Sequence, residues 1–362
     1  MKQPFILVGA GTEVATRVIL PACVRIREGQ QRWPEHVFAL VADGDEVTRT
    51  RYQAARIPSD RAAYVPLSVG QVREALAWRQ AELQENWRDE WEGLINRGPD
   101  NGASMLPAVG RLMIQSARPA IVQHLEAIRR RLAPKDAKAP EVFVVFSPVS
   151  GTSRGSVVDL PRYIRGVFPE AHIHGVVLHP VGLEDMDRAQ ARLFQANFVE
   201  ALKLIERETS EQTYRVWLDD AEGWQTVTGR VLDSVFAFDE RYGNLRRSHL
   251  SEPGRTLPGR LGALTERVTD FLTGIVTADP LYERTRGRLA DSELHRGEAT
   301  LDGHRTYVHA IHEVRASLNL EALRRALIER GLERVSRRLA EGRSQDALAA
   351  AGHVFDAPEA TL

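Results

Sequence analysis

Two short segments rich in glycine and hydroxyl side chains have the composition of anion-binding turns. GAGT at residues 9–12 directly follows the apolar run PFILV, and SGTSRG at residues 150–155 comes shortly after EVFVVF. A helical pattern succeeds each segment, so each would place the unpaired N–H groups and the positive dipole end of a helix beside the end of a strand. Two such turns in one sheet would hold one polyphosphate.

The first turn has two other interpretations. A dinucleotide-binding turn, GxGxxG, needs a third glycine where Val14 stands, although Asp43 at the end of the next apolar run imitates the acid that binds a ribose. A nicotinamide cofactor would leave the second turn without a role, so we rank it lower. The remaining interpretation is a tight turn from strand to helix that binds nothing.

Apolar runs and helical patterns alternate along the chain. Strands are expected at residues 4–11, 37–45, 62–67, 141–147, 171–180, 214–219, 234–239 and 305–318. Helices are expected at residues 12–26, from the cap residue Ser68 onward, and at 112–132, 187–207, 261–276 and 320–339. This alternation predicts an α/β fold with a mostly parallel, Rossmann-like sheet covered on both faces, and ligands at the carboxyl ends of its strands.

Composition excludes several classes of protein. The 362 residues are 43% hydrophobic and 27% charged, and 48 basic side chains nearly balance 49 acidic ones, which argues against a nucleic-acid partner. Cys23 is the only cysteine, so an intramolecular disulfide and a CxxC site are excluded. No apolar run approaches the roughly 20 residues that span a bilayer. We therefore expect a cytoplasmic protein with no membrane and no nucleic-acid partner.

The order of the motifs resembles that of the tubulin/FtsZ superfamily, and within it the bacterial tubulin-like domain family. SPVSGTSRGSVVDLPRYIR at residues 147–165 is similar to the signature phosphate loop, and ILVGAGTEVATRV and ALVADGD resemble the first and second loops. NGASMLPAVGR resembles the third loop, and residues 179–206 resemble the sugar-contacting loop with its helix. The segment FAFDERYGN stands where the family meets guanine. The resemblance covers residues 5–325.

This resemblance implies a division of the chain and a function. A nucleotide-binding domain is expected at residues 1–255, a central helix with its loop at 256–290, an abbreviated C-terminal part at 291–345 and a tail at 346–362. The implied function is binding of GTP or GDP, with Mg²⁺ left open as an accompanying ion, and weak or slow hydrolysis. The implied partner is another copy of the chain or a larger protein.

The resemblance also assigns residues to the site. Those expected to bind the nucleotide are Gly9, Gly11, Thr12, Asp43, Asp45, Gly102, Ser150, Gly151, Thr152, Ser153, Arg154, Gly155, Glu184, Arg192 and Glu240. Candidates for the acid that orients water between two subunits are Asp279, Asp291 and Glu293. His172 and His174 alternate on an expected strand without a third ligand, so no metal site is expected from them.

Departures from the family pattern leave a second function open. Glu13 and Val14 stand where the first loop carries glycines, and Ser150, Ser153 and Arg154 replace small residues of the signature loop. A carboxylate about 6 Å from a phosphate costs on the order of 2–3 kcal/mol at an effective dielectric near 20, while an arginine would offset that cost. The alternative function is therefore a degenerate pseudo-GTPase that serves as an interaction scaffold without nucleotide. An NAD(P)-dependent enzyme ranks below both.

Overall fold

The structure is a computed structural model that describes residues 3–77, 103, 106–132, 138–178, 187–210, 212–217, 224–238, 257–277 and 308–310. The chain divides into two compact units, residues 1–313 and 314–362, and every described residue belongs to the first. The expected domain boundaries at residues 255, 290 and 345 stay predictions.

Seven strands of the described part form one sheet in which every neighbouring pair is parallel. They are β1 (Phe5–Ala10), β2 (Val37–Asp43), β3 (Ala62–Pro66), β4 (Glu141–Phe146), β5 (His172–Leu178), β8 (Ser234–Phe238) and β9 (Val308–Ala310), in the order β3-β2-β1-β4-β5-β8-β9. β1, β2 and β4 are buried along their whole length, which explains their continuous apolar sequences. The expected α/β fold with a mostly parallel sheet is confirmed.

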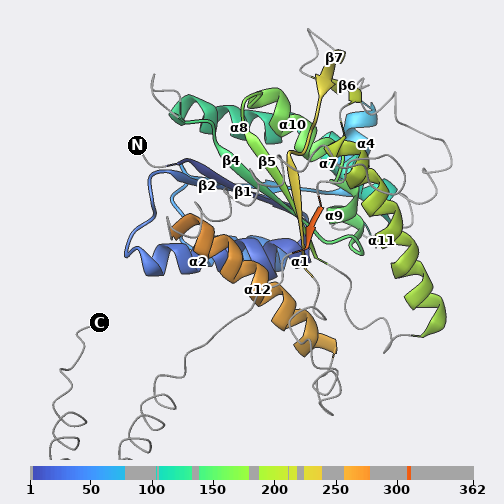
Figure 1. Ribbon diagram of the computed structural model, residues 1–362, viewed down its shortest axis with the longest axis horizontal. Helices are drawn as coiled ribbons and strands as arrows, with labels where there is room; N and C mark the ends of the chain where they lie inside the picture. Colours follow the sequence, from blue (N-terminus) through green and yellow to red (C-terminus); the bar gives the residue numbers. More distant parts are fainter. Residues whose placement is uncertain are drawn as a thin grey trace, which may run out of the picture. The chain divides into compact units, whose positions relative to one another are not determined.

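Helices cover both faces of this sheet (Figure 1). One face packs against α4 (Val69–Ala77), α7 (Pro107–Ser116), α8 (Arg118–Leu132) and α10 (Asp159–Val167). The other packs against α1 (Thr12–Val14), η1 (Ala15–Ile19), α2 (Leu20–Gly29) and α12 (Leu257–Thr277). The remaining helices are α3 (Glu46–Ala54), α9 (Gly151–Gly155) and α11 (Arg188–Thr209). No helix among the described residues is long and apolar enough to cross a membrane.

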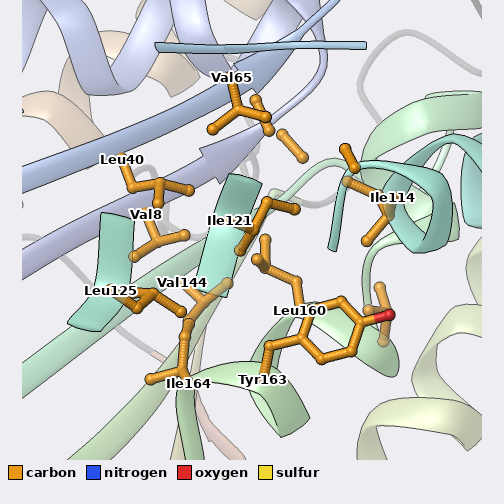
Figure 2. Packing of buried hydrophobic residues seen from close by; sticks show 14 of the residues in the cluster. Val8, Leu40, Val65, Ile114, Ile121, Leu125, Val144, Leu160, Tyr163 and Ile164 are labelled. Atoms are coloured by element: carbon orange, nitrogen blue, oxygen red, sulfur yellow. The ribbon is translucent and has the colours of Figure 1, made fainter. Parts of the chain in front are cut away.

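Alternate side chains of the strands enter two separate hydrophobic cores. Val8, Leu40 and Val144 face α8 and α10, where Figure 2 shows them beside Ile121 and Leu160. Their sequence neighbours in the same strands enter the core beneath α2 and α12. Since the period of a strand is two, both cores follow from one apolar run, and the sheet positions the loops at its edges rigidly.

The first helix changes geometry near a proline. α1, η1 and α2 are continuous, and the π-helical segment η1 ends just before Pro21, which has no N–H to donate within the helix. The guanidinium of Arg51 on α3 donates to the carbonyl of Thr16 at 3.1 Å, and the Thr269 hydroxyl of α12 lies 3.3 Å from the carbonyl of Arg17. Neighbouring helices therefore supply hydrogen bonds to carbonyls of the turn before Pro21, whose missing N–H leaves one helical acceptor without its donor.

Two expected elements differ from the structure. The strand expected at 214–219 is not in the parallel sheet, because β6 (Gln212–Trp217) pairs antiparallel with β7 (Trp224–Gly229) in a separate two-stranded sheet. The single helix expected at 112–132 is two helices that meet at Ala117. Pro119 explains the break, since it cannot donate a backbone hydrogen bond in the middle of a helix.

Two other expectations are confirmed. Ser68 caps α4 in a reciprocal capping box, in which its hydroxyl accepts from the backbone N–H of Gln71 at 3.0 Å and its own N–H donates to Gln71 Oε1 at 3.0 Å. The helix expected at 261–276 is α12, whose buried residues include Leu264, Val268 and Leu272.

Candidate functional site

The strand order of the sheet brings the two glycine-containing turns together. The chain passes from β1 outward to β2 and β3, and then crosses to β4 on the other side of β1. In open α/β sheets, ligands bind at the carboxyl ends of the strands where the order changes direction in this way. The segments GAGT and SGTSRG leave β1 and β4 at that point, so both expected turns lie at the switch point of the sheet.

Gly11 is the residue at which the two turns touch. A Cβ built on it would lie 3.3 Å from each of Ser150 Oγ, Ser153 N and Thr152 Cβ, and its φ of 88° is in the region that favours glycine. Its N–H also donates to the carbonyl of Ala42 at the end of β2, at 2.9 Å. A side chain at this position would be strained and would separate the two loops.

Serine hydroxyls hold the second turn in place. Ser150 caps α9 by accepting from the backbone N–H of Ser153 at 3.4 Å, and Ser153 Oγ accepts from the N–H of Ser147 at 2.8 Å. Ser153 is fully buried and Thr152 nearly so. The two serines that depart from the family's glycines therefore hydrogen-bond within their own loop.

The two acids at the end of β2 have different environments. Asp43 is buried and accepts hydrogen bonds from the side chains of Thr48 and Thr12. Burial raises the pKa of Asp43, while these two hydroxyls oppose the rise. Asp45 caps α3 by accepting from the N–H of Val47 at 2.8 Å. Of the two, Asp43 is thus the one that contacts the first turn.

Glu13 lies between the two turns. Ser147 Oγ, at the end of β4, donates to Glu13 Oε2 at 2.7 Å. Burial raises the pKa of the Glu13 carboxyl, and the Ser147 hydrogen bond and the charge of Arg17 act in the opposite direction. The sequence shows that Glu13 departs from the family pattern. It does not identify the partner of Glu13, because Ser147 is 134 residues away along the chain.

Arg154 is a cation held by a neutral side chain. Its guanidinium donates to Asn197 Oδ1 on α11, and burial lowers its pKa, while the charge of Glu200 on the same helix acts in the opposite direction. Its Nε is buried without a hydrogen-bond partner, and within the described residues Arg154 forms no ion pair. Desolvating a guanidinium without a paired carboxylate is unfavourable, and an anion beside it would relieve that cost.

Three of the glycines serve close packing. A Cβ on Gly9 would lie 2.6 Å from Val14 Cγ1, so this glycine lets the first helix approach β1. A Cβ on Gly110 would lie 2.2 Å from the carbonyl oxygen of Gly151, and one on Gly155 would lie 2.4 Å from Arg111 N. α7 and α9 therefore meet backbone to backbone.

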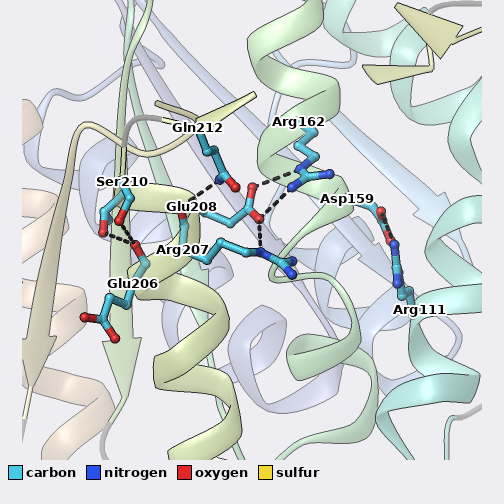
Figure 3. Close-up of polar contacts among 9 residues, drawn as sticks. Arg111, Asp159, Arg162, Glu206, Arg207, Glu208, Ser210 and Gln212 are labelled. Carbon is cyan, nitrogen blue, oxygen red and sulfur yellow. Dashed lines mark hydrogen bonds and ion pairs between the residues drawn. The ribbon is translucent and has the colours of Figure 1, made fainter. Parts of the chain in front are cut away.

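An ion pair reinforces the contact between the third loop motif and the signature motif. Arg111 binds Asp159 through two hydrogen bonds, from Nε at 2.6 Å and from an Nη at 3.0 Å (Figure 3). The carboxylate is buried, and Gln115 Nε2 also donates to it at 3.3 Å. Bidentate pairs of this kind are strong and geometrically specific, so they fix α7 against the start of α10.

The other expected site residues lie on the surface of α11 or outside the described part of the chain. Arg192 is exposed on α11. The expected residues that lie outside the described part of the chain are Gly102, Glu184, Glu240, Asp279, Asp291 and Glu293. Within the described residues, no group of three or more His, Cys, Asp or Glu could hold a metal ion. Cys23 is buried, and burial raises the pKa of its thiol to about 12.

A protein-family model described as "Tubulin like" matches residues 40–250, more than half of the chain. The chain belongs to the tubulin-like family. The expected resemblance is thereby confirmed, and with it the family that the motif order indicated.

Solved structures similar to this tubulin-like protein are distant in sequence. FtsZ from M. jannaschii is 14% identical with a TM-score of 0.44, over 77% of this chain and 58% of that one. CetZ from Methanosaeta thermophila is 14% identical with a TM-score of 0.43, over 76% and 55%. TubZ of Clostridium botulinum phage c-st is 10% identical with a TM-score of 0.38, over 77% and 62%. The match thus spans less than two thirds of each of these proteins. A search of curated protein sequences found no match.

A second polar cluster of the tubulin-like protein lies near the opposite ends of the strands. His174 Nε2 is 2.7 Å from Glu141 Oε2, and its Nδ1 is 2.7 Å from Ser234 Oγ. This is the order of groups in a serine hydrolase relay. Each of the three residues is only 4% exposed, and the rings of Phe143 and Phe236 lie against the imidazole, so no substrate reaches the hydroxyl. The cluster joins β4, β5 and β8 and is structural.

Further ion pairs lie near those same ends of the strands. Arg162 on α10 binds the fully buried Glu208 of α11 at 2.8 and 2.9 Å, and Arg207 also contacts this carboxylate, as Figure 3 shows. Arg165 binds Asp233 at 2.7 Å, and the same carboxylate accepts from the N–H of Ile173 at 2.7 Å. These carboxylates are occupied by arginines, in contrast to Glu13 at the switch point.

Proposed function

We propose that this tubulin-like protein binds a guanine nucleotide where the loops after β1 and β4 meet. Supporting this are the contact of Gly11 with residues 150–153 and the position of both turns at the switch point of the sheet. The single observation that carries the proposal is Arg154, a residue of the second turn whose Nε is buried and unpartnered and which forms no ion pair in the described residues. A phosphate would supply an acceptor and a negative charge in direct contact with the guanidinium.

The residues that would hold the nucleotide follow from this arrangement. The first N–H groups after Gly11 and Ser150, including that of Thr12, together with the side chain of Arg154, would bind phosphate oxygens. Asp43 would position Thr12, with which it shares a hydrogen bond. Roles for Gly102, Glu184, Arg192 and Glu240 at the sugar and base are proposed from the family resemblance alone. A bound GTP would supply the terminal phosphoanhydride bond that a weak GTPase hydrolyses.

Self-assembly, or assembly with a larger protein, is the second part of the proposal. Tubulin-like chains of the superfamily that the motifs resemble complete hydrolysis between subunits, and Asp279, Asp291 and Glu293 are the candidate acids for that contact. A location in the cytoplasm, which the single buried cysteine suits, belongs to the same proposal.

The test begins with the ligand of the purified protein. The protein is denatured, and the released nucleotide is identified by chromatography; GTP or GDP is the expected result. GTP added to nucleotide-free protein should raise its melting temperature, because a ligand that binds only the folded state stabilises it. Release of an adenine dinucleotide would instead support an NAD(P)-dependent enzyme.

One observation favours the scaffold without nucleotide as the second candidate. The Glu13 carboxylate lies between the two turns, bound by Ser147, and an anion there would be repelled. Absence of any released nucleotide, together with no thermal shift on adding GTP, would support the scaffold. Sedimentation of the protein with and without GTP then shows whether its assembly depends on nucleotide.

A further inference from the structure

Glu13 is placed so that it connects the two loops of the proposed nucleotide site. Its carboxylate accepts from Ser147 Oγ at 2.7 Å, and the N–H of Ser147 donates to Ser153 Oγ at 2.8 Å. Ser147 and Ser153 are almost completely buried. The carboxylate is therefore held at the junction of the loops by residues that are themselves fixed, rather than extended into solvent.

Few groups compensate the negative charge of Glu13. Ser147 on β4 gives it one hydrogen bond, and Arg17, one turn along its own helix, is the charged group that opposes the effect of burial on its pKa. Asp43, the acid at the end of neighbouring β2, is occupied by Thr12 and Thr48 and adds no positive charge. A second anion at this junction would meet an incompletely compensated carboxylate.

We propose that Glu13 determines the ligand specificity of this site by disfavouring anions in proportion to their charge, so that a guanine nucleoside diphosphate binds in preference to the triphosphate. This inference rests on the proposed nucleotide binding. An ionised carboxylate about 6 Å from a phosphate charge weakens binding about 100-fold at an effective dielectric near 20.

Protonation of Glu13 follows from the same coupling. If the nucleotide binds better beside the neutral carboxyl, then binding raises the pKa of Glu13 and takes up a proton. Affinity should therefore increase as the pH falls toward the already raised pKa of this group. The proton count distinguishes a charge effect from a steric one, because a side chain that merely fills space would take up no proton.

The experiment is calorimetric titration of the full chain with GDP and with GTP from pH 5.5 to 8. The variant Glu13→Gln keeps the acceptor for Ser147 and removes the charge. The matched control is Glu28→Gln, which changes an exposed glutamate on α2, the continuation of the same helix. At pH 8 we expect Glu13→Gln to bind GTP about 100-fold more tightly than the wild type, with a smaller gain for GDP. Glu28→Gln should behave as the wild type. The pH dependence of affinity measured for Glu13→Gln still contains the titration of the nucleotide's own phosphates. The difference between the wild-type and Glu13→Gln curves therefore reports the contribution of Glu13.

The possible results separate the role of Glu13 from nucleotide binding itself. Equal affinities of wild type and Glu13→Gln for GTP at every pH would overturn the role of Glu13 and leave nucleotide binding intact. No binding by either protein at any pH would overturn the proposed function, and the role of Glu13 with it. If Glu13→Gln does not fold, wild-type titrations in buffers of different ionisation enthalpy give the proton uptake directly. Net uptake of a proton on binding near neutral pH, beyond any change in the protonation of the nucleotide's own phosphates, supports the proposal. The absence of such uptake refutes the proposal.

Discussion

Arg154 and Glu13 give the two loops at the switch point opposite charges, each bound by a neutral side chain. Asn197 accepts from Arg154, and Ser147 donates to Glu13. In the described part of the chain neither charge is neutralised by an ion pair, whereas Arg111, Arg162 and Arg165 are all paired with carboxylates. Within those residues, Glu200 and Arg17 act on these two charges without forming an ion pair with them, and the proposed ligand would lie beside both charges.

At the residue scale, replacing Arg154 should weaken nucleotide binding. Arg154→Ala removes a charge-assisted hydrogen bond worth about 1.5–3 kcal/mol, which corresponds to about a 10- to 100-fold loss of GDP affinity. Calorimetric titration measures it. Arg188→Ala, which removes an exposed arginine from the start of α11, is the control and should leave the affinity unchanged. Equal affinities of all three proteins would place the phosphates away from Arg154.

At the scale of elements, α7 and α9 form the closest contact of the site. Gly110 and Gly155 allow the two backbones to meet, and the Arg111–Asp159 pair holds α10 to the same helix. α9 carries the second turn, so its position depends on this contact. The conformation of the turn is thus set by its packing against α7.

A methyl group at Gly110 should disrupt this contact. Gly110→Ala places a carbon 2.2 Å from a backbone oxygen that cannot move freely. We expect a loss of about 1–3 kcal/mol in the free energy of unfolding, the usual cost of overpacking, measured by chemical denaturation. Gly262→Ala on α12, where the Cβ meets nothing within 4 Å, is the matched control and should gain about 0.5–1 kcal/mol. Destabilisation of both variants alike would mean that the contact is not responsible.

The buried cluster on β4, β5 and β8 gives a second prediction for the elements. His174→Ala removes the imidazole between Glu141 and Ser234 and should destabilise the fold by about 3 kcal/mol, as the breaking of buried polar pairs does. His172→Ala changes an exposed residue of the same strand and should have almost no effect. Thermal or chemical unfolding of the two variants makes the comparison. A negligible effect at His174 would show that the cluster contributes no net stability.

At the scale of the whole molecule, sequence patterns predict the sheet better than the contacts within the site. β1, β2 and β4 are almost entirely apolar runs, as is typical of strands of a parallel sheet that is covered on both faces. The segment at 212–217, QTYRVW, also has strand character but mixes polar with apolar residues, and it pairs in a hairpin, because strand character does not specify a partner.

Contacts between distant residues explain what the sequence could not predict at the site. The positions of both turns follow from the strand order, whereas the sequence predicted only that both turns follow strands of one mostly parallel sheet. The bonds of Glu13 with Ser147 and of Arg154 with Asn197 join residues 134 and 43 positions apart. Such pairs depend on how helices and loops pack, and only the departure of Glu13 and Arg154 from the family pattern signals that they matter.

Assembly gives the prediction that belongs to the whole chain. If hydrolysis is completed between copies, the rate of phosphate release per molecule should rise with protein concentration, because each site needs a neighbour. Asp279, Asp291 and Glu293 are replaced singly by Ala. The variant that lacks the acid involved should still bind GTP and sediment with it, but should release phosphate at least about tenfold more slowly. A loss of this size is usual when a group that acts on the attacking water is removed. Phosphate release and sedimentation, measured on the same samples, test both parts, with Glu28→Gln as the charge control. A rate per molecule that does not change with concentration would mean that any hydrolysis occurs within one chain, and the three acids would then have no catalytic role between subunits.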